Sequence, residues 1–184
     1  MPWTLIIIGI VVVVLILWLV STQRKLAVMD ENVNNSLSQI GVLLSSRFDA
    51  LTALLELTKG YAEHEYKTLS DTVNARRSVI TASSNAADVA AQENVITEAL
   101  GRINAVAESY PDLKADKTYQ ETMKSVNDYE KSVRQGRLVY NDSVTKLNRS
   151  LRMFPTNLVG GMFGFTSREY LAAEADKAQM PSMK

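Results

Sequence analysis

An uninterrupted apolar run near the amino terminus constrains this chain more than any other feature. Trp3 to Val20 reads WTLIIIGIVVVVLILWLV and carries no charged side chain. About 18 residues at about 1.5 Å rise each make a helix of about 27 Å, close to the thickness of the bilayer hydrocarbon. Trp3 and Trp18 lie near its two ends, where indole rings favour the headgroup level. The run therefore predicts a transmembrane helix.

The residues that flank this run favour a retained anchor over a cleaved signal peptide. No basic side chain precedes the run, and the LWLVSTQ that closes it offers no small-x-small cleavage site. Lipoprotein processing is excluded because the chain has no cysteine. Arg24 and Lys25 follow the run directly, and basic residues favour the cytoplasmic side of a membrane. We therefore expect the rest of the chain to be cytoplasmic.

Composition limits the functions open to the remaining residues. Lys+Arg and Asp+Glu both count 20, so the formal net charge is zero. Nucleic-acid-binding proteins carry a clustered basic excess, so we expect no nucleic-acid partner. The absence of cysteine excludes a disulfide framework and a thiolate nucleophile. About 160 residues follow the membrane segment, which is enough for a single compact core.

Beyond the membrane run, apolar residues recur in steps of three and four, as in a helix with one coiled-coil-like apolar face. No Pro or Gly separates this stripe from the membrane run. We therefore predict one continuous helical rod from the bilayer to about Thr58. The stripe comprises Leu26, Met29, Val33, Leu37, Ile40, Leu44, Phe48, Leu51, Leu55 and Thr58.

Breaker and cap signals divide the next part of the chain. Gly60 is a weak breaker, after which the helical period resumes over residues 62–80. Asn85 with Asp88 has the spacing of a helix N-cap and predicts a third helix. Pro111 ends that helix, because the residue before a proline is biased away from helical geometry.

Similar signals predict two further elements. Thr118 with Glu121 has the spacing of a capping box and predicts the start of a long helix that Pro155 stops. Thr166 with Glu169 predicts a short amphipathic helix to about residue 178, followed by a frayed tail.

These elements predict an all-α fold, in which an N-terminal transmembrane helix continues into an antiparallel up-and-down helical bundle. The bundle has four helices if the chain turns at Gly60, and three, one of them about 85 Å long, if it does not. We favour four, because a single return helix would leave over half of the longer rod uncovered. The expected domains are the membrane anchor at 1–23, the bundle at 24–154, and an apolar turn, short helix and tail at 155–184.

Several short motifs follow one another along the soluble part. They are GYAEHE from Gly60, LSDTVNAR from Leu69, ESYPDLKA from Glu108, YNDSV from Tyr140 with Asn148 beyond, FPTNL from Phe154, and FGF from Phe163. In this order they resemble the LemA family of bacterial membrane proteins. The resemblance implies a membrane anchor, a cytoplasmic bundle of four helices and no established enzymatic activity. With the flanking charges, it indicates a single-pass protein of the bacterial inner (cytoplasmic) membrane, with its N-terminus outside and its C-terminal domain cytoplasmic.

The sequence departs from the family pattern at one place. Residues 51–55 read LTALL, where the family commonly has a proline-containing IPNLV run. Any kink made by that proline is therefore in doubt here.

His64 and Glu65 form the most suggestive chemical pair, because H-E opens the zincin motif. The second zinc ligand would be residue 68, which is Thr68, and His64 is the only histidine of the chain. No histidine-rich zinc site can form within one chain, and we expect no cofactor. The alternative, which we favour, is that His64 caps or hydrogen-bonds at a helix junction.

Arg137, Tyr140 and Asn141 form a second candidate site, together with Arg76, because polar groups beside a helix seam can recognise a carboxylate or a peptide. We expect a structural role instead, in which arginines pair with carboxylates on the stripes, such as Glu93. Serines such as Ser36 and Ser143 lack a histidine base other than His64.

The apolar segment after the last long helix forms a third candidate. In a bundle of four helices the fourth returns to the membrane, so Leu158 to Phe165, LVGGMFGF, would lie at the bilayer surface. This segment could dip into the interface, cover a neighbouring protomer, or plug the end of its own bundle. Its candidate interaction residues are Phe154, Pro155, Asn157, Phe163 and Phe165.

These features together predict a membrane-anchored, non-enzymatic scaffold that acts through helix-to-helix contacts. Its expected partners are the lipid bilayer and further copies of itself, as a homo-oligomer. The alternative is an adaptor or regulator of another membrane protein, such as a membrane protease.

Overall fold

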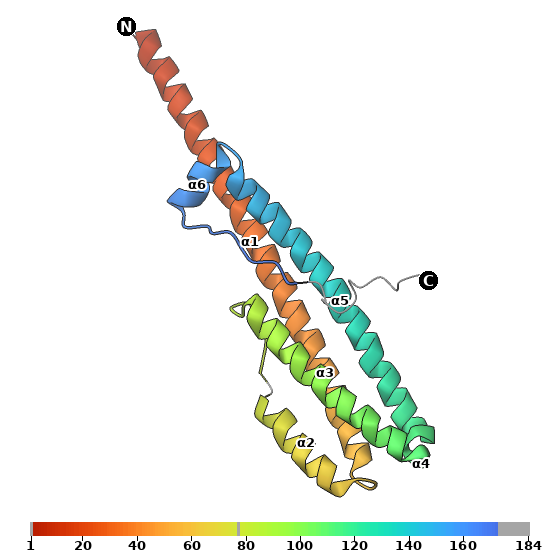
Figure 1. The fold of residues 1–184 in the computed structure, drawn as a ribbon. Helices are drawn as coiled ribbons and strands as arrows, with labels where there is room; N and C mark the ends of the chain where they lie inside the picture. Colours follow the sequence, from red (N-terminus) through yellow and green to blue (C-terminus); the bar gives the residue numbers. More distant parts are fainter. Residues whose placement is uncertain (1, 77, 173–184) are drawn as a thin grey trace, which may run out of the picture.

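The computed structural model describes residues 2–76 and 78–172, and all regular secondary structure within them is helical. The helices are α1 (Pro2–Thr58), α2 (Glu63–Arg76), α3 (Ala86–Ser109), α4 (Pro111–Ala115), α5 (Lys117–Arg152) and α6 (Thr156–Met162). Figure 1 shows α1 and α5 as a long antiparallel pair, with α2 and α3 beside the distal half of α1 and α6 near its middle. The prediction of an all-helical chain is confirmed.

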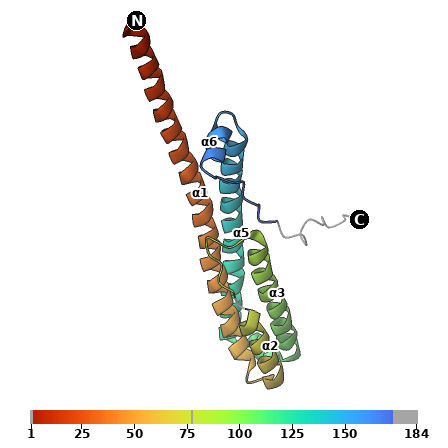
Figure 2. The same ribbon diagram turned by 90° about the vertical axis from the view of Figure 1, so that its left-hand side faces the viewer.

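The first helix is one uninterrupted element of 57 residues, as the sequence predicted. Within the described ranges it is the one helix long and apolar enough to cross a bilayer, and its apolar window is not buried against the rest of the chain. This N-terminal third projects alone beyond the other helices (Figure 2). The stripe from Leu26 to Thr58 is buried in the core except for Met29, which packs partly buried against it.

The first helix ends at Thr58, and the chain turns at residues 59–62. The backbone N–H groups of Tyr61 and Ala62 both donate to the carbonyl of Thr58, at 3.0 and 2.9 Å. The chain then reverses into α2, which buries Leu69 and Val73. The turn thus lets α2 cover the end of α1.

The second helix is shorter than the period predicted, because it ends at Arg76 instead of about Ile80. Ser78 donates from both its N–H and its hydroxyl to Oε1 of Gln92 on α3, each at 2.7 Å. Ile80 is buried, yet it lies in a non-helical segment that crosses α1. Ile80, although it continues the helical spacing, therefore packs against α1 from outside any helix.

Gly41 on α1 makes this crossing possible. A Cβ at residue 41 would lie 2.3 Å from the carbonyl oxygen of Ile80, which is backbone and cannot rotate away. By contrast, a Cβ at Gly101, inside α3, would meet nothing within 4 Å.

Alanine at these two glycines is expected to change stability in opposite directions. Gly41→Ala should lower the free energy of unfolding by about 1–3 kcal/mol, because the crossing segment must shift. Gly101→Ala should raise it by roughly 0.5–1 kcal/mol, because alanine is the better helix former. Thermal unfolding of both variants checks this, and equal stabilisation by both would show that Ile80 does not pack on α1.

The caps of the later helices agree only in part with the sequence signals. Asn85 is the N-cap of α3, as predicted, and together with Asp88 it forms a reciprocal capping box. The box predicted at Thr118 is wrong: α5 begins two residues earlier, with Asp116 as its N-cap accepting from the Tyr119 N–H at 2.9 Å. Between α3 and α5 lies α4 (Pro111–Ala115), a single helical turn that was not predicted from the sequence.

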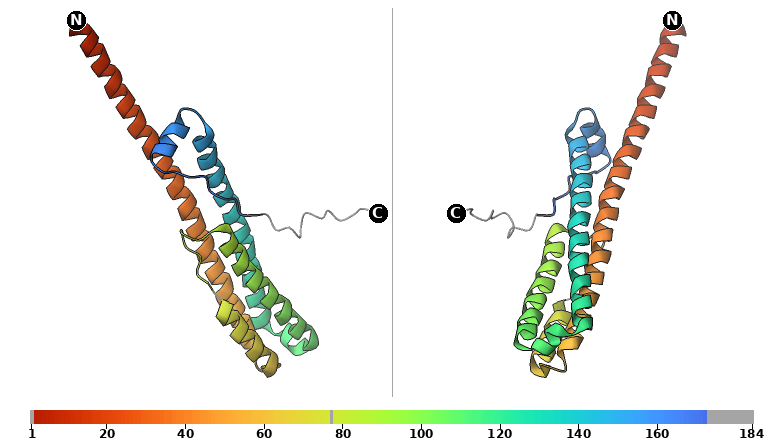
Figure 3. Two further views of the ribbon diagram at one scale, coloured as in Figure 1. Left: turned by 60° about the vertical axis from the view of Figure 1, so that its left-hand side comes forward. Right: turned by 90° about the vertical axis from the view of Figure 1, so that its right-hand side faces the viewer.

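The α1–α5 pair forms the long axis of the domain, and polar contacts fix its register. Arg47, almost fully buried, donates to Glu130 at 3.1 Å, whereas nearer the membrane run the hydroxyls of Ser36 and Ser143 are 3.4 Å apart. At the end of the pair nearest the apolar run, the Ser150 hydroxyl lies 3.4 Å from the sulfur of Met29. The end of α5 is therefore beside the part of α1 that follows the apolar run (Figure 3).

The C-terminal segment departs from the sequence prediction at two points. The helix predicted from Thr166 is wrong for the described residues, since 165–172 have no helical structure, while 173–178 lie outside the described range. The last long helix, predicted to run until Pro155 stops it, ends at Arg152, and Phe154 lies beyond α5 and is 78% exposed.

Candidate functional site

Residues 163–172, here called the strap, lie along α5 and are bound to it by side chains. Asn148 donates to the carbonyl of Arg168 and accepts from its N–H, both at 2.9 Å. Asn141 makes the same pair of bonds with Leu171, both at 3.0 Å. Two asparagines thus bind the backbone of an extended segment as a neighbouring strand would.

The spacing of the two asparagines explains why this works. Seven residues of helix advance about 10.5 Å, and three residues of extended chain advance about 10 Å. Asn141 and Asn148 therefore meet Arg168 and Leu171 in register. Asparagine is a poor helix former, so two of them on one face of a long helix are a signal that a sequence reading can use.

Two more of the predicted site residues extend this contact. The Tyr140 hydroxyl donates to the carbonyl of Glu169 at 3.0 Å, and Arg137 donates to the carbonyl of Ala172 at 3.1 Å. Burial raises the pKa of Tyr140, which keeps its hydroxyl protonated as a donor. Arg137 also forms an ion pair with Glu93 of α3, as the sequence reading expected.

One ion pair that sequence reasoning missed ties the strap to α1. The guanidinium of Arg168 donates to one carboxylate oxygen of Asp30 from two nitrogens, at 2.9 and 3.1 Å, and contacts Asn34 at 3.4 Å. Asp30 and Arg168 are 138 positions apart, so no local pattern signals the pair. The strap therefore links α5 to α1 just beyond the apolar run.

Replacing Asn148 with alanine is expected to release the strap locally without unfolding the domain. The Arg168 amide should exchange with solvent roughly 30-fold faster, since two bonds of about 1 kcal/mol each are lost. Amide hydrogen exchange measures this directly. Asn127→Ala, on an exposed position of the same helix, is the matched control, and equal exchange at Arg168 in both variants would contradict the role of Asn148.

His64 lies at the distal end, near the start of α2, where it lines a cleft of 510 Å³ with Thr68, Arg102, Ser109 and Tyr110. The Ser109 hydroxyl is directed to the carbonyl of Ala105, to which it donates at 3.1 Å. The backbone of Glu65 is helical, but its side chain lies outside the described part. The structure thus brings His64 beside a serine that donates elsewhere.

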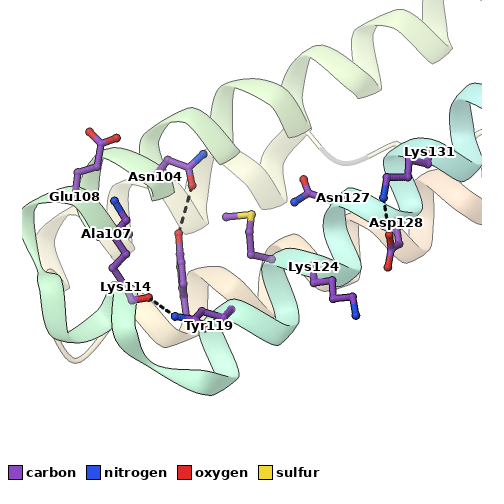
Figure 4. Close-up of a pocket in the computed structure, with 11 residues that line it drawn as sticks. Asn104, Ala107, Glu108, Lys114, Tyr119, Lys124, Asn127, Asp128 and Lys131 are labelled. Atoms are coloured by element: carbon purple, nitrogen blue, oxygen red, sulfur yellow. Dashed lines mark hydrogen bonds and ion pairs between the residues drawn. The ribbon is translucent and has the colours of Figure 1, made fainter.

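A second cleft, of 600 Å³, also lies at the distal end, between α3, α4 and α5 (Figure 4). Burial raises the pKa of Tyr119, whose hydroxyl donates to Asn104 across the cleft at 3.3 Å. Lys131 pairs with Asp128 at its edge, at 3.1 Å. Charged side chains of both signs line it, among them Glu108, Lys114 and Lys124. Among the described residues, no three histidine, aspartate or glutamate side chains gather as a metal site would require.

The remaining predicted site residues lie at the opposite end, around α6. Phe154 and Pro155 form the turn between α5 and α6, and Asn157 follows at the start of α6. Phe163 is exposed, whereas Phe165 is partly buried against the core and donates from its N–H to Gly160 at 3.0 Å. The structure therefore divides the predicted residues between α6, the strap and the distal cleft.

Comparison with known proteins gives one family. Residues 36–184 match the model of the LemA family, well over half of the chain. Similar relatives include the magnetosome proteins MamQ 1 and MamQ 2 of Paramagnetospirillum magneticum, each 24% identical over 86% of this chain and 68% of the relative. The magnetosome protein MamQ of Magnetospirillum gryphiswaldense is 23% identical over 77% of this chain, which spans 61% of that relative.

Proposed function

Because this chain belongs to the LemA family, we propose that it is a membrane-anchored, non-enzymatic helical scaffold that self-associates through helix-to-helix contacts. We place it in the bacterial inner membrane, with its N-terminus outside and its helical domain in the cytoplasm. Arg24 and Lys25, directly after the apolar run, support this orientation.

The observation that carries the proposal is the continuity of α1. One helix holds both the exposed apolar run and the buried stripe on which α2, α3 and α5 pack. A rigid element shared by membrane and domain can hold neighbouring chains at a fixed height and tilt above the bilayer. Such a helix suits a scaffold, which positions other molecules, better than it suits an enzyme, which transforms a substrate.

The α1–α5 seam supports self-association. A shallow cleft of 410 Å³ opens along it, lined mostly by small or hydroxyl-bearing side chains. Small side chains let helices approach closely, as helix pairs within membranes also show. The lining residues are Ser46, Asp49, Ala50, Thr118, Glu121, Thr122, Ser125 and Tyr129.

Light scattering of the detergent-solubilised full chain tests the proposal. We expect the protein mass of the complex to be at least twice the 20.4 kDa of one chain. Since the chain has no cysteine, Ser46→Cys can be cross-linked without background, with Leu138→Cys, exposed on the opposite face of α5, as the control. A monomer that becomes large only when another membrane protein is added would overturn the scaffold and favour the adaptor. Turnover in a hydrolase screen would overturn its non-enzymatic character.

A further inference from the structure

The end of the domain nearest the apolar run carries several exposed apolar side chains. We call residues 153–163, the turn and α6 together, the α6 cap. Val159 and Gly160 are buried against the domain, whereas the opposite side of the cap is free. The exposed side chains are Met153, Phe154, Leu158, Met162 and Phe163, between 48% and 78% exposed.

The cap lies at a defined height along α1. A Cβ at Gly160 would be 3.9 Å from Leu26, so the cap packs on α1 at that residue. Leu26 is six residues beyond Val20, which is about 9 Å of helix. A headgroup layer is about 5–8 Å thick on each side of the hydrocarbon. The cap therefore meets the outer edge of the headgroup layer, and its turn reaches toward the apolar run (Figures 1 and 3).

Basic side chains precede the cap on α5 and lie next to Leu26 on α1. Arg24 and Lys25 on α1, and Arg149 and Arg152 at the end of α5, are all exposed. Neither residues 21–29 nor residues 149–163 contain an aspartate or glutamate. This combination of apolar and basic groups at one height complements the acyl boundary and the anionic headgroups of a bilayer.

We propose that the α6 cap inserts its apolar side chains into the surface of the bilayer that α1 crosses, while the four basic side chains contact anionic phosphate headgroups. The chain is then attached to the membrane at two points, which fixes the tilt and rotation of the domain. This inference rests on the proposed membrane span of α1. Because the cap packs beside Leu26, the surface that it would contact is the bilayer that α1 crosses.

Single-cysteine variants of the full chain test this inference, with a fluorophore attached at one site in each. Met162→Cys reports on the cap, Ala115→Cys on the distal end and Val12→Cys on the membrane span. The chain is reconstituted at low density in vesicles of phosphatidylcholine with one third phosphatidylglycerol, which contain quencher-bearing lipids. The label at Met162 should lose most of its fluorescence, and the label at Ala115 should keep it. Leu158→Cys, at a second exposed position, repeats the measurement.

The outcomes separate this inference from the proposed anchor. If Val12 is quenched and Met162 is protected, the anchor stands and the inference is wrong, because the cap then plugs its own domain. If Val12 itself is protected, the membrane span fails and the inference fails with it. Quenching at Met162 that disappears as protein density rises would assign the cap to a second copy and also overturn the inference.

Charge gives an independent check. Replacing both Arg149 and Arg152 with glutamine should reduce quenching at Met162 to the level measured in vesicles of phosphatidylcholine alone. The matched control is Arg134→Gln, an exposed arginine farther along α5. If quenching at Met162 is equal in both lipid mixtures and unchanged by the two arginine substitutions, the anionic headgroups do not contribute to binding of the cap.

Discussion

Replacing Leu147 with aspartate is expected to unfold the helical domain at temperatures at which the unaltered chain is folded. Leu147 is fully buried between α5 and the rest of the core. Loss of a buried leucine side chain costs about 2–5 kcal/mol, and a carboxylate buried without a partner adds several more. Because a domain of this size is stable by only about 5–15 kcal/mol, most of that stability should be lost. Circular dichroism during heating, in one detergent throughout, measures the effect.

The same helix supplies the control. Leu138 lies nine residues earlier, which places it about 180° around α5, and it is 69% exposed. Leu138→Asp should change the free energy of unfolding by no more than about 0.5 kcal/mol. Leu147→Met, which keeps the volume, should cost less than about 1.5 kcal/mol. An unchanged melting temperature for Leu147→Asp would show that this face of α5 is exposed.

Features that depend on periodicity could be predicted from the sequence. The buried stripe of α1 follows from steps of three and four, because every third or fourth residue of a helix shares a face. Periodicity failed at Ile80, where a buried apolar residue at helical spacing lies on a crossing segment that Gly41 admits.

Features that depend on competition between local signals could not be predicted. Thr118 with Glu121 offers a helix start, but Asp116, two residues before Thr118, caps α5 instead by accepting from the Tyr119 N–H at 2.9 Å. Thr166 with Glu169 offered a start as well. There, Asn141 and Asn148 bind the backbone that a helix would need for its own bonds. Tertiary contacts thus override a local cap.

The candidate site was predictable in its residues but not in its partners. Tyr140 and Asn141 stood out in the sequence, and both bind the strap. That they bind the chain's own C-terminal segment follows from the path of the backbone, which no spacing encodes. The pairing of Asp30 with Arg168 joins distant parts of the chain for the same reason.

Inserting Gly-Pro after Thr22 is expected to uncouple the domain from the membrane span. In the unaltered chain this region is helical, and Thr22 donates to the carbonyl of Trp18 at 2.9 Å. A proline inside a helix costs about 3 kcal/mol or more, so the helix should break there and amides at residues 20–30 should exchange about 100-fold faster. Amide exchange of the full chain in lipid discs measures this.

Inserting Ala-Ala at the same place separates loss of the helix from added length. Two alanines keep the helix, so exchange at residues 20–30 should stay slow, but they rotate the domain by about 200° and raise it by about 3 Å. A label on the domain should then be immobile with Ala-Ala and mobile with Gly-Pro. If residues 20–30 already exchange fast in the unaltered chain, α1 is not a rigid rod. The domain would then have no fixed height above the bilayer, and a scaffold that depends on that height could not work in this way.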